Sequence, residues 1–191
     1  MTPPAIALVL AAGFSRRFGE DKRWTVLRSG KPMIEQVLAQ IAAAQIPAHV
    51  VLRADDPHRS AHAWSVPTLV ISADDAGRGL GASIAAATRQ LPDDQSVLIC
   101  LGDLPYIKPE TYRAVADALA EHRLVVPVFR GQRGHPVGFG AYFLPELRHL
   151  DGDSGAREIL QRHRDQVFEL AVDDPGALHD IDTVADLLVG L

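Results

Sequence analysis

Three basic side chains, Arg16, Arg17 and Lys22, lie within seven positions of one another near the N-terminus. They follow an apolar segment over 5–10, which reads as a buried β-strand, and a run of small residues over 11–13. A buried strand that continues into such a loop can direct backbone N–H groups at a phosphate, and the cations can add charge-assisted contacts. The pattern predicts a phosphate-binding loop, and a turn whose charges are only solvated is the alternative.

A candidate metal ligand, Asp103, closely follows the most hydrophobic strand expected in the chain, Ser96–Leu101. Gly102 delivers the carboxylate, and Pro105 stiffens the exit of the chain. Ligands of open α/β sheets collect at the carboxyl ends of the strands, where a carboxylate can hold Mg²⁺ against a triphosphate. An aspartate that only shapes a turn is the alternative, and the basic loop near the N-terminus favours the metal site.

Other chemistries find little support in the residue pattern. The glycine-rich stretch 77–81 lacks the spacing of a dinucleotide-binding fingerprint and follows the third expected strand, which argues against a dehydrogenase. His49, His58 and His62 have neither a companion cysteine nor the spacing of zinc ligands. The chain shows no evident Ser-His-Asp or Cys-His arrangement. The residue types instead suit phosphoryl transfer, for which cations, a metal-holding carboxylate and backbone donors suffice.

The apolar periodicity predicts the elements that must position these residues. Strands are expected at 5–10, 49–52, 68–71, 96–101, 124–129, 137–139 and 167–172, and helices at about 32–45, 83–90, from 109 onward, 142–150, 156–163 and 184–191. Strands that alternate with helices are typical of an α/β fold with a mainly parallel sheet. The glycine-rich segment 130–136 breaks this alternation as a β-ribbon, and inserted tips of this kind often carry a second substrate. The polar segment 53–67 is expected to be a loop with one helical turn.

The bulk composition is that of an ordinary globular protein. The 191 residues are 47% apolar and 23% charged and contain no repeat or linker, which predicts one domain over 1–191. A net charge of −5 argues against nucleic-acid binding, and no apolar run is long enough for a membrane span. The start of the chain lacks the charged region of an export signal, and the single cysteine, Cys100, cannot form an internal disulfide. A cytoplasmic location is therefore expected, with Cys100 as a small buried hydrophobe.

The order of these motifs resembles the nucleotidyltransferase family of molybdenum cofactor biosynthesis, and the resemblance spans about residues 5–188. The first motif, over 10–22, matches the family pattern Leu-Ala-(Ala/Gly)-Gly-x-Ser-x-Arg followed by lysine, although Phe18 replaces the usual methionine and one extra residue precedes Lys22. Five further motifs stand in the family's order at 79–83, 102–105, 131–137, 152–157 and 180–183. The resemblance implies a nucleotide-diphospho-sugar transferase type (Rossmann-like) three-layer α/β sandwich, with a mostly parallel sheet, one antiparallel strand and a β-ribbon excursion.

Ala12 favours one branch of this family. The guanylyltransferase branch usually carries Leu-Ala-Gly-Gly, whereas this chain has Leu-Ala-Ala-Gly and looks like the molybdenum cofactor cytidylyltransferases. The resemblance implies transfer of CMP from CTP to the molybdopterin cofactor with release of pyrophosphate, and transient contact with a molybdenum hydroxylase or its chaperone. The alternatives are another NTP such as GTP, a sugar or polyol phosphate acceptor, or a non-catalytic escort that binds the finished cofactor. An escort would not need Lys22 and Asp103 together.

The resemblance also assigns roles to matching positions of this chain. It implies catalytic roles for Lys22, Arg16 and Asp103, and a site for Mg²⁺, with Mn²⁺ as the alternative, on Asp103 and Asp182. It implies nucleotide contacts from Leu10, Ala11, Ala12, Gly13, Ser15, Arg16, Lys22, Arg78, Gly79 and Ser83. It implies pterin contacts from His135, Pro136, Asp153 and Arg157, although Asp153 or Ser154 could equally cap the following helix.

Arg23 and Trp24 depart from the family pattern, which commonly continues after the lysine with an aliphatic pair. Trp24 is expected to pack against the sheet. The alternative is that Trp24 reshapes the nucleotide pocket, which would change the base that the pocket accepts.

Overall fold

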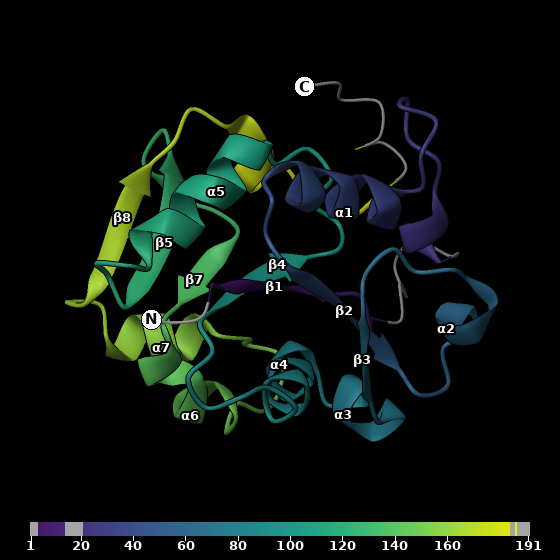
Figure 1. Cartoon of the computed structure of the whole chain (residues 1–191), viewed down its shortest axis with the longest axis horizontal. Coiled ribbons are helices and arrows are strands. Elements are labelled where there is room, and N and C mark those ends of the chain that lie inside the picture. Colours follow the sequence, from purple (N-terminus) through teal and green to yellow (C-terminus); the bar gives the residue numbers. More distant parts are fainter. Residues whose placement is uncertain (1–3, 14–20, 184–185, 187–191) are drawn as a thin grey trace.

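An eight-stranded sheet forms the centre of the protein (Figure 1). The computed structural model describes residues 4–13, 21–183 and 186. The strands are β1 (Ile6–Leu10), β2 (Ala48–Arg53), β3 (Thr68–Ile71), β4 (Val97–Leu101), β5 (Leu124–Phe129), β6 (Gln132–Arg133), β7 (Val137–Phe139) and β8 (Val167–Ala171). They are arranged in the order β3-β2-β1-β4-β7-β5-β6, and β8 pairs with β5.

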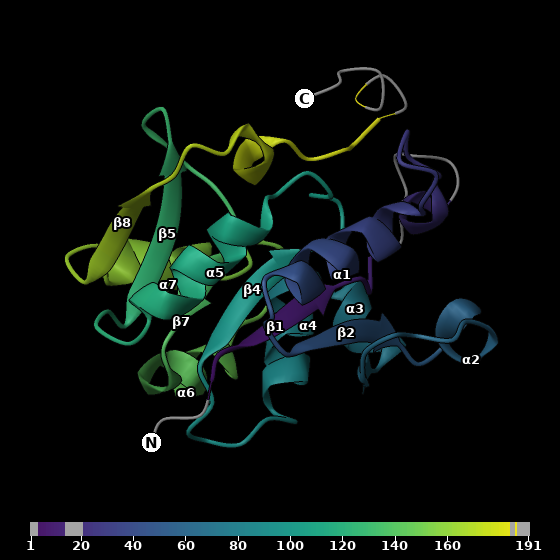
Figure 2. The ribbon, with the colours of Figure 1, turned by 45° about the horizontal axis from the view of Figure 1, so that its top comes forward.

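Helices cover both faces of this sheet. They are α1 (Met33–Ala43), α2 (His58–Ala61), α3 (Ala73–Gly77), α4 (Leu80–Thr88), α5 (Pro109–Ala118), α6 (Leu144–Leu147) and α7 (Arg157–Arg162), with short 3₁₀ helices η1 (Lys22–Trp24), η2 (Ala141–Phe143) and η3 (Pro175–Leu178). Helices α1 and α5 lie on one face, and α3, α4, α6 and α7 lie on the other (Figures 1 and 2). The predicted three-layer α/β sandwich is confirmed.

The sheet is mostly parallel, as predicted. Strand β1 runs parallel to β2 and β4, β3 runs parallel to β2, and β8 runs parallel to β5. Strand β7 is antiparallel to both β4 and β5, and the short β6 folds back on the end of β5. The last two pairings form the β-ribbon excursion that the glycine-rich segment predicts.

The central strand β1 is apolar on both faces because helices cover both. Ala7 and Val9 pack in the cluster on the side of α1 and α5, whereas Leu8 and Leu10 pack in the cluster on the side of α4. Successive side chains of a strand point to opposite faces, so this division follows directly from the continuous apolar run. The packing holds β1 rigidly up to Leu10, the last residue before the basic loop.

Pairing of β1 with β4 places the two predicted site motifs side by side. Leu10 at the end of β1 is opposite Leu101 at the end of β4, and the Gly102 N–H donates to the Leu10 carbonyl at 3.2 Å. The loop after Leu10 and the carboxylate of Asp103 therefore leave the sheet at the same edge.

Two sequence expectations need correction. Residues 73–77 form the helix α3, although the sequence predicts a loop there, and α4 begins at Leu80 instead of Ser83. The Ser72 side chain accepts from the Asp75 N–H at 3.0 Å and so caps the unexpected helix α3. Gly79, with a φ of 118°, separates α3 from α4 in a conformation that favours glycine.

The second correction concerns the helix after residue 155. Neither Asp153 nor Ser154 caps α7 through its side chain, because the Ser154 hydroxyl donates instead to Glu158 at 2.5 Å. Asp153 points elsewhere, as the next subsection shows. The closing helix predicted over 184–191 lies outside the described residues, apart from Asp186.

Cys100 is a buried hydrophobe, as expected. Its side chain in β4 is 0% exposed, and burial raises the pKa of the thiol far above its usual range. A buried thiol held in the neutral form is a poor nucleophile. Within the described part of the chain, no helix has the length and apolar character needed to cross a membrane.

Candidate active site

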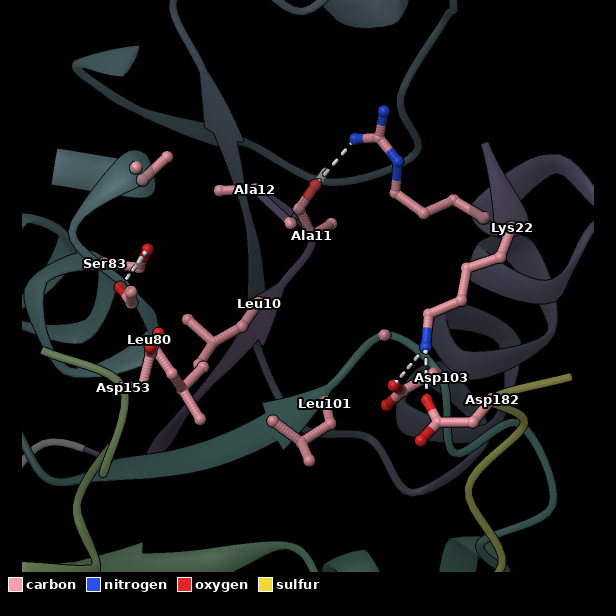
Figure 3. Close-up of a pocket in the computed structure, with 16 residues that line it drawn as sticks. Leu10, Ala11, Ala12, Lys22, Leu80, Ser83, Leu101, Asp103, Asp153 and Asp182 are labelled. Atoms are coloured by element: carbon pink, nitrogen blue, oxygen red, sulfur yellow. Dashed lines mark hydrogen bonds and ion pairs between the residues drawn. The ribbon is translucent and has the colours of Figure 1, made fainter. Parts of the chain in front are cut away.

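A cavity of about 470 Å³ opens at the carboxyl edge of the parallel strands. It is lined by Leu10, Ala11, Ala12, Gly13, Lys22, Arg23, Ala76, Gly77, Gly79, Leu80, Ser83, Leu101, Gly102, Asp103, Asp153 and Asp182. The charged residues Lys22, Asp103 and Asp182 lie at one end, and Leu80, Ser83 and Asp153 lie at the other (Figure 3). The cavity therefore has an ionic end around Lys22 and a second end, the Leu80 end, where one apolar side chain lies beside two polar ones.

Lys22 connects the two carboxylates of the ionic end. Its Nζ lies 2.7 Å from Asp103 Oδ2 and 3.1 Å from Asp182 Oδ1, and it also donates to the Ile181 carbonyl at 3.3 Å (Figure 3). Burial lowers the pKa of Lys22, but the charges and hydrogen bonds of the two aspartates outweigh it, so the pKa lies above its ordinary value. Lys22 is a fixed cation at neutral pH.

The carboxylate of Asp103 has an oxygen to spare. Asp103 Oδ1 is buried and has no hydrogen-bond partner among the described residues, while Oδ2 is held by Lys22. A buried oxygen without a partner is costly unless a ligand completes it, and a carboxylate oxygen suits Mg²⁺ or Mn²⁺. Among the described residues no cluster of three acidic, histidine or cysteine side chains could hold a metal alone. The donor set thus fits an ion whose remaining ligands are phosphate oxygens and water.

The small residues after β1 form the wall between these groups and the sheet. Ala11 and Ala12 are each 3% exposed and, with Gly13, line the cavity. The Arg23 guanidinium donates to the Ala11 carbonyl at 2.6 Å, and Arg53 Nη1 donates to the Gly13 carbonyl at 3.2 Å. Two arginines therefore hold the backbone of this loop through its carbonyl groups.

Ser15 and Arg16, which the resemblance assigns to the nucleotide, lie outside the described residues, as does Arg17. Their roles stay predictions.

Trp24 packs away from the cavity, in line with the first of the two expectations for it. It contacts the apolar cluster beneath α1, and its ring lies 5.8 Å from that of Trp64 and 4.7 Å from that of His62. The residue that reaches the cavity is its neighbour Arg23, which departs from the family pattern but receives no role of its own from the sequence. The only sequence feature that points to Arg23 is that it stands where the family commonly has an aliphatic residue.

The Leu80 end of the cavity depends on a close contact between the start of α4 and the loop 151–153. The Gly81 N–H donates to the Gly152 carbonyl at 2.8 Å, which fixes the loop 151–153 against the start of α4. Asp153 consequently lines the same cavity as Ser83, although the resemblance assigned the two residues to different substrates. A Cβ atom on Gly79 would overlap Asp153 Oδ1 and lie 2.7 Å from the Gly152 carbonyl oxygen.

We expect Gly79→Ala to weaken nucleotide binding, because it must displace Asp153 and strain a backbone at φ 118°. Strain of this kind costs about 1–3 kcal/mol, and the displaced loop adds to it. The matched control is Gly131→Ala, which has a φ of 80° but nothing within 4 Å of the added methyl. Thermal unfolding should show a loss in both variants, and titration with nucleotide should show a loss only in Gly79→Ala. Equal nucleotide affinities in the two variants would contradict the assignment of Asp153 to this cavity.

Several predicted residues do not line the cavity. Arg78 follows α3 directly, and its side chain is exposed and pairs with Asp75 at 2.9 Å and with Asp151 at 3.2 Å. Pro136 and Arg157 are also absent from the lining.

His135 lies behind the ionic end rather than in the cavity lining. Burial lowers its pKa, against the raising effects of a hydrogen bond with the Ile99 backbone and of the charges on Asp103 and Asp180. Its ring is therefore neutral at pH 7, and its buried Nδ1 has no hydrogen-bond partner. The predicted pterin contact of His135 stays a prediction.

Comparison with known proteins gives a consistent match over most of the chain. The family described as the MobA-like NTP transferase domain matches residues 7–167. The purine catabolism protein PucB of Bacillus subtilis is 29% identical, and the match covers 95% of this chain and 93% of PucB. The bifunctional protein GlmU of Kineococcus radiotolerans is 31% identical over 88% of this chain, which spans only 34% of GlmU.

The solved structures agree with this match. Rv0371c from Mycobacterium tuberculosis superposes with a TM-score of 0.86 at 28% identity, and the alignment covers 100% of both chains. A complex of Rv0371c with manganese superposes with a TM-score of 0.78 at 25% identity over 96% of both chains. The likeness extends over the whole sheet and over the elements that line the cavity.

Proposed function

Because the chain belongs to the family of MobA-like NTP transferase domains and is a nucleotidyltransferase, we propose that it transfers CMP from CTP to the molybdopterin cofactor and releases pyrophosphate. The family membership confirms the resemblance drawn from the motifs. The observation that carries the proposal is the placement of Lys22 between Asp103 and Asp182, beside the small-residue loop and within one cavity. This combination suits a triphosphate better than a neutral ligand.

The proposed step is an in-line displacement at phosphorus. A phosphate oxygen of the acceptor attacks the α-phosphorus of the triphosphate and forms a new oxygen–phosphorus bond. The bond from the α-phosphorus to the oxygen bridging to the β-phosphate breaks, and pyrophosphate leaves with the electron pair. This attack brings like charges together, so catalysis consists mainly of positioning and charge neutralisation. No side-chain nucleophile is required.

Lys22 supplies the fixed positive charge in this scheme. Two carboxylates hold it at the ionic end of the cavity, where preorganised positive charge can stabilise the transition state. When bound, a divalent ion would neutralise charge on the triphosphate. Asp103 and Asp182 would hold that ion, and the manganese complex of Rv0371c supports the use of a divalent metal. We propose Mg²⁺, with Mn²⁺ as the alternative.

CTP is proposed for two reasons. Ala12 stands where the guanylyltransferase branch carries glycine, and it lines the cavity. The Leu80 end of the cavity also offers hydrogen-bond acceptors in Asp153 and Ser83. The Ser83 hydroxyl donates its proton to the Gly79 carbonyl at 3.0 Å, so its oxygen can accept from a ligand. Cytosine carries an exocyclic amino group that such acceptors can bind, and uracil does not.

A second candidate keeps the chemistry and changes the substrates. The 31% identity to GlmU over 88% of the chain favours another NTP or another phosphorylated acceptor, such as a sugar phosphate. A non-catalytic escort is the weakest alternative, because nothing in cofactor binding requires Lys22 to bridge two carboxylates.

Pyrophosphate release with each of the four NTPs tests the proposal. The assay is run with and without molybdopterin and with Mg²⁺, Mn²⁺ or a chelator. We expect release only with CTP, molybdopterin and a divalent ion together. Turnover with GTP but not with CTP, or with a sugar phosphate in place of molybdopterin, would favour the second candidate. Binding of molybdopterin without turnover of any NTP would favour the escort.

A further inference from the structure

The Arg23 side chain joins three segments of the chain that are distant in sequence. Its guanidinium contacts the Ala11 carbonyl, the Asp56 carboxylate at 2.5 Å and the Asp21 carboxylate, to which Nε donates at 2.7 Å. The side chain is only 6% exposed, so these contacts are shielded from water. Asp21 precedes Lys22, Ala11 belongs to the small-residue loop, and Asp56 lies in the loop after β2.

Asp56 is committed entirely to this arrangement. Its side chain is 0% exposed, one oxygen accepts from Arg23, and the other accepts from the His58 N–H at 2.9 Å. Burial lowers the pKa of Arg23, but Asp21 and Asp56 outweigh it, so Arg23 stays charged. A buried ion pair contributes little net stability compared with well-packed apolar side chains. Stability alone is therefore a weak reason for an Arg23–Asp56 pair at the edge of the cavity.

The direction of the backbone gives the pair a second role. Across a planar trans peptide, the carbonyl of one residue and the N–H of the next point in opposite directions. The bond from Arg23 to the Ala11 carbonyl therefore turns the Ala12 N–H away from Arg23, and Arg53 acts in the same way on the Ala12 carbonyl at 3.4 Å. Ala12 and Gly13 line the cavity, and N–H groups turned away from the arginines can contribute to a binding site for an anion there.

We propose that Arg23, anchored by Asp56, is a positioning residue that sets the small-residue loop to bind the triphosphate. The same side chain restrains the turn that carries Lys22, because Asp21 accepts from the Arg23 backbone N–H at 3.3 Å as well as from the guanidinium. Arg23 thus couples the position of the backbone donors to that of the catalytic cation. The inference rests on the binding of a nucleoside triphosphate and not on the identity of its base.

The conservative variant Arg23→Lys tests this role. Lysine keeps the charge but cannot reach Ala11, Asp21 and Asp56 at once with a planar fork. We expect the dissociation constant of the preferred nucleoside triphosphate, chosen by the four-NTP assay, to rise roughly 10-fold or more, as for the loss of a charge-assisted hydrogen bond. Binding of the corresponding nucleoside, which lacks phosphates, should change less than about 2-fold. Calorimetry or equilibrium dialysis measures both constants.

Arg148→Lys is the matched control. Arg148 pairs with Asp93 at 2.5 Å and donates to the Leu91 carbonyl at 2.7 Å, but it lies outside the cavity. We expect it to lose stability without losing triphosphate affinity. The proposal is overturned if Arg23→Lys binds the triphosphate as the wild type does, if it loses nucleoside and triphosphate affinity equally, or if Arg148→Lys shows the same loss.

A second variant covers the case in which Arg23→Lys does not fold. Asp56→Asn keeps the shape of the anchor and removes its charge, and thermal unfolding shows whether the variant is folded at the assay temperature. We expect the same selective loss of triphosphate affinity. If the wild type neither turns over nor binds any nucleoside triphosphate, the proposed function fails. If the wild type binds one and both variants bind it equally well, the role of Arg23 is overturned and the proposed function is not.

Discussion

Lys22→Ala should lower the rate of nucleotidyl transfer by about 10²-fold or more, which is the order seen when one donor to the transition state is removed. Lys22 Nζ lies 2.7 Å from Asp103 and 3.1 Å from Asp182, so its charge is fixed at the ionic end of the cavity. The variant also leaves the two carboxylates facing each other without a cation. Single-turnover kinetics with saturating CTP and molybdopterin measure the chemical step separately from binding.

The matched control for Lys22 is Lys108→Ala. Lys108 also donates to a backbone carbonyl, that of Asp173 at 2.8 Å, but it lies outside the cavity. We expect this variant to keep the wild-type rate. An unchanged rate in Lys22→Ala would remove Lys22 from the mechanism.

Asp103→Ala should abolish turnover and leave the fold intact. Asp103 lines the cavity and has one buried carboxylate oxygen without a partner among the described residues, and its loss removes one of the two residues proposed to hold the divalent ion. Asp103 is 22% exposed in its side chain and belongs to no apolar cluster, so its removal creates no cavity in the core. Turnover across a titration of Mg²⁺ and of Mn²⁺ measures the effect, and circular dichroism checks the fold.

Asp151→Ala is the control for the loss of an acidic side chain near the site. Asp151 pairs with Arg78 at 3.2 Å on the surface and does not line the cavity. It should keep both the rate and the dependence on metal concentration. If Asp103→Ala retained near-normal activity, the metal site would have to be assigned elsewhere.

Much of the fold follows from local sequence patterns. The continuous apolar runs of β1 and β4 predict central parallel strands, and the structure pairs them in register from Ile6–Val97 to Leu10–Leu101. Helix α3 escaped prediction because it is only five residues long and depends on the Ser72 cap rather than on apolar periodicity. Short elements of this kind are decided by single hydrogen bonds, which a pattern over many residues does not detect.

The site could be predicted where it depends on strand ends and motifs. The position of Asp103 follows from the end of β4, and the loop at 11–13 follows from the end of β1. The bridge from Lys22 to Asp182 joins residues 160 positions apart, and only the resemblance to a family placed them together.

The role of Arg23 could not be predicted, because its partners Ala11 and Asp56 come from two other segments. Their convergence on one guanidinium is a property of the folded chain. Likewise, the meeting of Asp153 and Ser83 depends on the close approach of Gly81 to Gly152, which no spacing in the sequence reveals.

We propose that the protein transfers the α-phosphate of CTP, as CMP, to molybdopterin. The most direct measurement follows radioactive phosphorus from CTP labelled at the α position, with molybdopterin and Mg²⁺ present. We predict that the label appears in a dinucleotide product with the pterin, and that the β- and γ-phosphates leave together as pyrophosphate. A label that stays in unreacted CTP, or that is transferred only to another acceptor, would contradict the account. Transfer only from another NTP labelled in the same way would contradict it as well.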